Sequence, residues 1–180
     1  MIYLDYAAST PVNEEVLSTY NKLTKEYYAN PNSNHKLGKK SKELIDKYTK
    51  DIALKLGVLP EELIYTSGAT ESNNLAIKGV GERYKSFGKH ILISALEHNS
   101  IVASAVKMQS LGFEVEIIPV RNDGLIDIES LKKMIRKDTI LVSVCSVDSE
   151  IGLVQPISKI KEVLKDYPKD RKSTRLNSSH

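Results

Sequence analysis

The segment YTSGATESNN, residues 65–74, joins an apolar run to a stretch rich in hydrogen-bonding side chains. Its small central residues allow backbone N–H groups to approach a ligand, and Thr70 adds a hydroxyl. A helix that begins near Glu71 would direct the positive end of its dipole to the same place, which suits a phosphate group. An ordinary helix cap by Thr70 is the alternative, and this motif alone does not decide between them.

His98 follows a second apolar run, residues 90–94. A histidine just past a strand end can act as a general acid or base, stack on a flat ring or bind a metal. His35, His90 and Cys145 show no spacing that would form a metal set with it, so we predict no metal site. Satisfaction of a local hydrogen bond is the alternative for His98, and we expect only that role for His35 and His90.

A third polar segment, DSEIG at residues 148–152, follows another apolar run, and Gln155 comes shortly after it. Such a cluster can hydrogen-bond the oxygens of a cofactor, and Gly152 permits a tight turn. A plain turn that leads into a helix is the alternative. Cys145 lies within the apolar run, where a buried and unreactive thiol is expected rather than a nucleophile.

Hydrophobic periodicity predicts the scaffold that would position these segments. Short strands are expected at residues 63–65, 90–94, 113–120 and 140–147. The expected helices run from 13 to about 28, from about 37 to 56, after 70 (Ala76, Val80 and Tyr84 on one face), after 99 (Ile101, Ala105 and Met108 on one face), near 128–136, and around 157–164.

Strands and helices alternate after residue 60, which favours an α/β fold with a mostly parallel sheet and covering helices. In such sheets ligands bind beyond the carboxyl ends of the strands, and the three polar segments all follow predicted strands. We therefore predict that they form one site. Residues 1–60 are expected to form an N-terminal helical arm and residues 61–169 the sheet domain.

The composition restricts the cellular setting. The chain has 180 residues, one cysteine and no apolar run of the ~18–20 residues that a membrane span needs. A single cysteine excludes an intrachain disulfide framework and fits a reducing compartment. The N-terminus lacks the features of an export signal, so we expect a soluble cytoplasmic protein with no membrane partner.

Residues 170–180 break the pattern, because they have no apolar periodicity and their codons would resemble a sequencing-library adapter. We interpret them as an artefactual tail rather than a natural polar tail or a basic arm. The full chain has a net charge of +3, but without the tail 23 Lys+Arg and 22 Asp+Glu remain. The charge therefore gives no reason to expect a nucleic-acid partner.

Five segments occur in the order found in cysteine desulfurases: YLDYAASTPV, NPNSNHKLGKKSKELI, YTSGATESNN, EHNSI and SEIGLVQPI. Residues 2–169 thus resemble this family of the class V aminotransferase group, which uses pyridoxal 5'-phosphate. The resemblance implies part of the large domain of the aspartate-aminotransferase fold. It implies an enzyme that converts L-cysteine to L-alanine and an enzyme persulfide, supplying sulfur for iron–sulfur clusters or thiolation.

The resemblance also implies site residues. Ala69 and Thr70 match the residues that hold the cofactor phosphate. His98 matches the catalytic histidine, which stacks on the pyridine ring and takes part in proton transfer. Ser149 stands where the family usually has an asparagine that hydrogen-bonds the cofactor's phenolic oxygen. Gln155 lies in a matching segment, without an assigned role.

The resemblance further implies a homodimer and a possible sulfur-acceptor protein. The family's cofactor-binding lysine, pyridinium-pairing aspartate and sulfur-accepting cysteine are expected downstream, so we expect this N-terminal fragment to be inactive by itself. A selenocysteine lyase or another class V enzyme is an alternative. A non-catalytic scaffold homologue is another, motivated by Ser149 in place of asparagine.

Overall fold

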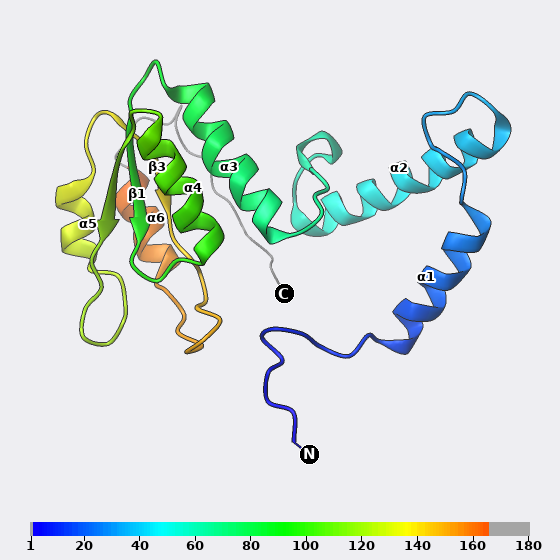
Figure 1. Cartoon of the computed structure of the whole chain (residues 1–180), viewed down its shortest axis with the longest axis horizontal. Helices are drawn as coiled ribbons and strands as arrows, with labels where there is room; N and C mark the ends of the chain where they lie inside the picture. The colour runs from blue at the N-terminus through cyan, green and yellow to red at the C-terminus, as the bar shows by residue number, and fades with distance from the viewer. Residues whose placement is uncertain (1, 166–180) are drawn as a thin grey trace. The chain divides into compact units, whose positions relative to one another are not determined.

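The computed structural model describes residues 2–165 (Figure 1). The proposed tail at 170–180 lies outside the described residues. By its contacts the chain divides into two compact units, one up to Tyr65 and one from Thr66 onward. No helix in the described part of the chain is long and apolar enough to cross a membrane.

The first unit contains helices α1 (Glu14–Glu26) and α2 (Lys36–Leu56) and a short 3₁₀ turn, η1 (Pro60–Glu62). Asn13 begins α1, because its side-chain oxygen accepts the main-chain N–H groups of the first turn. Gly57 ends α2 in the left-handed conformation, with φ of 67°. These boundaries agree with the helices predicted from the sequence.

The second unit is a three-stranded parallel sheet covered by helices. The sheet order is β2-β1-β3, and both pairings are parallel, which confirms the predicted α/β class. Its elements are α3 (Ala69–Tyr84), β1 (His90–Ser94), α4 (Asn99–Ser110), β2 (Glu114–Ile118), α5 (Ile128–Met134), β3 (Thr139–Ser143) and α6 (Ile157–Lys165).

The central strand β1 is buried along its whole length, because helices cover both faces of the sheet (Figure 1). Ile91 and Ile93 point into one hydrophobic core with residues of α3 and α4. Leu92 points into a second core with residues of α5 and α6. Each such side chain stabilises the fold by about 1.5–3 kcal/mol through removal from water.

The buried stripe of α3 differs from the predicted one. Its buried residues are Asn73, Ile77 and Gly81, whereas the predicted face of Ala76, Val80 and Tyr84 is only half-buried. A Cβ atom at Gly81 would collide with the end of the Met108 side chain of α4, so a glycine allows this close packing. Compared with the prediction, α3 is thus rotated about its axis so that the small Gly81 and the polar Asn73 face the interior. A pattern of apolar residues alone does not reveal such a rotation.

Two strand predictions need correction. Residues 63–65 form no strand, and Ile64 and Tyr65 are largely exposed, because this segment has no ladder partner among residues 2–165. The strand predicted at 140–147 ends at Ser143. Beyond it, Val147 forms only an isolated bridge with Val154, since the chain folds back on itself in the intervening turn.

Candidate functional site

Two of the three predicted segments follow the neighbouring strands β1 and β3. The third opens α3 after an irregular segment rather than after a strand. The first residues of α3 and α4 and the turn after β3 lie at the same edge of the second unit, the lower edge in Figure 1. The structure thus brings the three segments to one edge.

Gly68 is the N-cap of α3, and no side chain caps this helix. Thr70 lies in the first helical turn, so it does not provide the ordinary cap that was the alternative to a phosphate site. Glu71 folds back, and its carboxylate accepts hydrogen bonds from the N–H (2.6 Å) and hydroxyl (2.7 Å) of Ser67. These bonds lower the pKa of Glu71. The N–H groups of the first turn, including that of Ala69, remain at an exposed surface.

His98 is the N-cap of α4, and its side chain is exposed. Its Nδ1 accepts a hydrogen bond from the Ser100 main-chain N–H at 3.1 Å and lies 2.8 Å from the Ser100 hydroxyl. The Ser100 hydroxyl accepts a third hydrogen bond, of 2.8 Å, from the side-chain amide of Asn73 in α3. Ser100 and Asn73 are both buried. The His98 ring is therefore held at Nδ1 by Ser100 of α4, whose hydroxyl is in turn bound by Asn73 of α3.

Glu97 ties the ends of β1 and β3 together. Its Oε1 accepts hydrogen bonds from the hydroxyl of Ser94, at the end of β1, and from that of Ser143, at the end of β3, at 3.1 and 3.2 Å. Burial raises the pKa of the Glu97 carboxyl above the ordinary glutamate value. The two hydroxyls and main-chain groups of Cys145 and Ser94 offset part of that increase.

The segment 148–152 forms the tight turn that its composition predicts. The Asp148 carboxylate accepts the N–H groups of Glu150 and Ile151 at 2.9 and 2.8 Å. Gly152 has a φ of 67°, which favours glycine. Ser149 lies exposed at the start of the turn, so its hydroxyl can contact a ligand at this edge.

Gln155 and Cys145 have structural roles. The amide of Gln155 is buried, accepts the N–H of Ile126 at 2.9 Å and donates to the carbonyl of Gly124 at 3.0 Å. Cys145 lies just beyond β3, half-buried, with its thiol 3.0 Å from the Val147 carbonyl. Burial, with the negative charge of Glu97, raises the pKa of this thiol, which disfavours the reactive thiolate.

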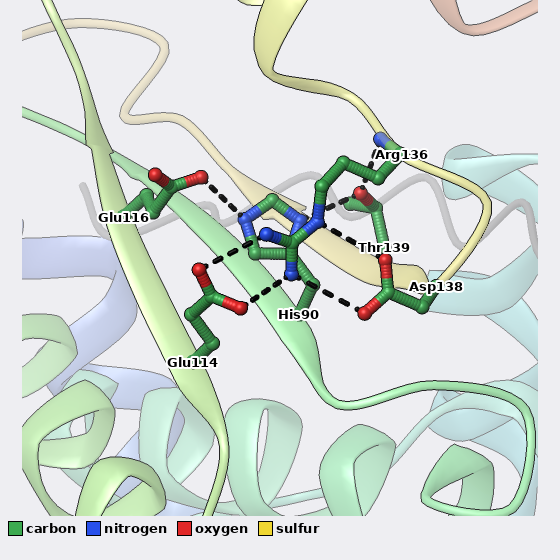
Figure 2. A network of polar contacts seen from close by, with 6 residues as sticks. All are labelled: His90, Glu114, Glu116, Arg136, Asp138 and Thr139. Carbon is green, nitrogen blue, oxygen red and sulfur yellow. Dashed lines mark hydrogen bonds and ion pairs between the residues drawn. The ribbon is translucent and has the colours of Figure 1, made fainter.

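The other two described histidines have local roles, as predicted. The Nδ1 of His35 accepts the Gly38 N–H at 3.2 Å and caps α2. His90 is fully buried at the start of β1, where Nδ1 contacts the Thr139 hydroxyl at 2.7 Å and Nε2 contacts Glu116 at 2.8 Å. Figure 2 shows this network, which Glu114, Arg136 and Asp138 complete. It lies at the amino ends of the strands, away from the candidate site.

Three residues of this edge were not predicted from the sequence: Asn73, Glu97 and Ser100. Asn73 falls at helical spacing with Ile77 and Gly81, but a buried asparagine is not expected without knowledge of its partner. Glu97 directly precedes His98, so the sequence indicated that it lies close to the candidate site. The sequence did not indicate that Glu97 contacts β3. Their roles depend on neighbours that are distant in sequence.

A family profile and a protein of known sequence both match nearly the whole of this chain. The sequence profile of the family described as Aminotransferase class-V matches residues 2–169. A cysteine desulfurase IscS of Dictyoglomus turgidum is 41% identical over 166 residues, which are 92% of this chain and 42% of that protein. The chain thus spans less than half the length of this curated relative.

Two solved structures are also similar. A NifS-like protein superimposes with a TM-score of 0.89 at 33% identity, covering 93% of this chain and 46% of the other. A structure described as SspA in complex with cysteine superimposes with a TM-score of 0.83 at 36% identity, covering 92% of this chain and 48% of the other. The fold of this chain is therefore shared with part of each of these proteins.

Proposed function

Because the chain belongs to the class V aminotransferase family, we propose that it is the N-terminal part of a pyridoxal-phosphate-dependent cysteine desulfurase. The complete enzyme would transfer the sulfur of L-cysteine to its own cysteine thiol, giving L-alanine and a persulfide. A sulfur-acceptor protein would then take this sulfur for iron–sulfur clusters or thiolation. We further propose that the protein is cytoplasmic and forms homodimers.

The donor groups at the start of α3 fit the phosphate of this cofactor. The helix has no side-chain cap, and its first-turn N–H groups, at Ala69 and Thr70, are exposed together with the Thr70 hydroxyl. Main-chain N–H groups, a hydroxyl and a helix N-terminus are the donors that bind phosphate in proteins. Glu71 is turned back onto Ser67, which directs its charge into the preceding loop.

The other residues of the edge would orient the ring. His98 stands at the start of α4 with Nδ1 bound to the helix, which leaves Nε2 as the atom available to a ligand. Ser149 would donate its hydroxyl to the cofactor's phenolic oxygen, with a shorter reach than asparagine. When bound, the cofactor withdraws electrons from the amino-acid substrate and so assists bond cleavage. The protein contributes orientation and exchangeable protons.

The observation that carries this proposal is that the starts of α3 and α4 and the turn after β3 lie at the same edge of the second unit (Figure 1). The chain that builds this edge is 41% identical to a protein named cysteine desulfurase. The structure described as a complex with cysteine supports the choice of substrate. A selenocysteine lyase or another class V enzyme would share this edge, so the substrate has to be tested directly.

The test measures binding of pyridoxal phosphate to the full-length protein through the visible absorption band of the bound cofactor. Wild-type protein is expected to bind the cofactor and to release alanine from L-cysteine faster than it releases alanine from L-selenocysteine. Thr70→Val should weaken binding of pyridoxal phosphate roughly 10-fold to 100-fold, because a hydrogen bond to a charged group contributes about 1.5–3 kcal/mol. Binding of pyridoxal, which lacks the phosphate, should not change.

Thr24→Val provides the matched control. Thr24 is an exposed threonine of α1, and among residues 2–165 its hydroxyl bonds only the Tyr20 carbonyl of its own helix, so the same substitution should leave cofactor binding intact. A folded protein that stays colourless with excess cofactor would support a scaffold homologue instead. Faster turnover of selenocysteine than of cysteine would favour the lyase.

A further inference from the structure

A buried polar chain reaches His98 from the neighbouring helix. The side-chain amide of Asn73, in α3, donates to the hydroxyl of Ser100, in α4, and this hydroxyl lies 2.8 Å from Nδ1 of His98. We propose that Asn73 and Ser100 are positioning residues that hold the neutral ring of His98 in the tautomer with its proton on Nε2. The nitrogen available to a ligand is then a hydrogen-bond donor.

The tautomer follows from the protons of the three groups. The Ser100 main-chain N–H can only donate, and it points at Nδ1, so Nδ1 must offer its lone pair. Because Nδ1 then carries a lone pair, the Ser100 hydroxyl must be the donor in its 2.8 Å contact with Nδ1, and the amide of Asn73 donates to one of the two acceptor positions of the Ser100 oxygen. With the proton on Nδ1 instead, the Ser100 N–H would face another N–H and lose its acceptor.

Burial of these groups raises the free energy of the other tautomer of His98. Asn73 and Ser100 are each 6% exposed, so water cannot replace a lost partner. A buried donor without an acceptor costs more free energy than an ordinary hydrogen bond contributes, and this cost acts against the other tautomer. The packing of α3 against α4 through Ile77 and Gly81 holds the two polar groups in register.

The consequence for chemistry rests on the proposed function. A ring with a proton on Nε2 can donate to an oxygen of a ligand at this edge, but it cannot take a proton there as a base. To act as a base through Nε2, the ring would have to move its proton to Nδ1 and break the contacts to Ser100. The polar chain therefore assigns Nε2 of His98 to hydrogen-bond donation in the resting protein.

Nuclear magnetic resonance of ¹⁵N-histidine-labelled full-length protein without cofactor tests this inference. The histidine signals that are lost in His98→Asn are those of His98, and asparagine keeps a residue type that caps helices well. At a pH where the ring is neutral, Nδ1 of His98 is expected to give an unprotonated-type resonance and Nε2 a protonated-type resonance. A protonated-type Nδ1 would overturn the proposal.

Variants at Ser100 and Asn73 then distinguish an effect on the His98 tautomer from an effect on folding. Ser100→Ala should move both nitrogen shifts toward those of a tautomer mixture, with the Nε2–H to Nδ1–H ratio falling roughly threefold to tenfold. Ser100→Thr keeps the hydroxyl and should retain the wild-type shifts. Asn73→Leu should shift the ratio in the same direction as Ser100→Ala. Helix content by circular dichroism confirms that each variant is folded.

Asn74→Leu is the matched control, because Asn74 is the next residue of α3 and, in the described part of the chain, its amide bonds only the Thr70 carbonyl of the same helix. It should leave the His98 shifts unchanged. Unchanged shifts in both Ser100→Ala and Asn73→Leu would refute the positioning role. If the shifts behave as expected but pyridoxal phosphate does not bind, the proposed function fails while the ring state stands.

Discussion

Replacement of Glu97 tests whether this carboxylate joins the two strands that carry the site. Glu97 accepts hydroxyl hydrogen bonds from Ser94 of β1 and Ser143 of β3, and burial raises its pKa. Glu97→Ala would leave both hydroxyls without their acceptor. At about 1–1.5 kcal/mol for each bond, we expect the free energy of unfolding to fall by about 2–3 kcal/mol.

Glu97→Gln changes the pH dependence rather than the packing. A carboxyl whose pKa is higher in the folded state stabilises the protein below its unfolded pKa, and this contribution is lost as the pH rises through the folded pKa. Glutamine keeps an oxygen for both hydroxyls and has no charge to bury. The variant should therefore lose less stability than wild type between acidic and neutral pH, and it should keep most of its stability at neutral pH.

Urea unfolding followed by circular dichroism at several pH values measures both effects, since the chain contains no tryptophan. Glu82→Gln is the control, because Glu82 is an exposed residue of α3 that, among the described residues, forms an ion pair only with Lys85. Its effect on stability should stay within about 0.5 kcal/mol. Parallel stability profiles for wild type and Glu97→Gln would refute the burial argument. A negligible cost of Glu97→Ala would refute the strand link.

Three further predictions concern other parts of the second unit. Gly88→Ala should lower the melting temperature, with a cost of about 1–3 kcal/mol, because its Cβ would lie 2.6 and 2.7 Å from main-chain carbons of Asp138. Gly79 lies in α3 with open space around it, so Gly79→Ala should raise the melting temperature through about 0.5–1 kcal/mol of helix propensity. Melting temperatures that shift in the same direction in the two variants would contradict this prediction. Hydrogen bonds from Arg136 lower the pKa of Glu114, so their stabilisation is lost as the pH falls. The stability difference between wild type and Arg136→Met in urea should therefore shrink toward acidic pH, and a constant difference would argue against the pair.

Much of the fold follows from local sequence. The run at 90–94 is apolar at its three central positions, and it forms the central strand with the predicted bounds because both of its faces are covered. The glycines at 57 and 112 follow α2 and α4 with positive φ, as their lack of a Cβ atom allows. The turn at 148–152 forms because aspartate and glycine satisfy its main chain locally.

The failed predictions share a physical cause. Residues 63–65 have a strand-like composition, but a strand exists only where a neighbouring chain accepts and donates hydrogen bonds. The buried face of α3 was misplaced because a glycine and an asparagine pack against α4, and neither residue type indicates burial by itself. For α3 the deciding partner, α4, is distant in sequence, and residues 63–65 have no ladder partner among residues 2–165.

The same distinction applies to the candidate site. The sequence by itself determined the segments with suitable chemistry, since Ala69, Thr70, His98 and Ser149 stand in recognisable motifs. Only the tertiary structure decided that Glu97 joins two strands and that Asn73 reaches Ser100 from another helix. A hydrogen bond between residues 27 or 46 positions apart depends on how helices and strands pack, and local sequence does not encode that distance.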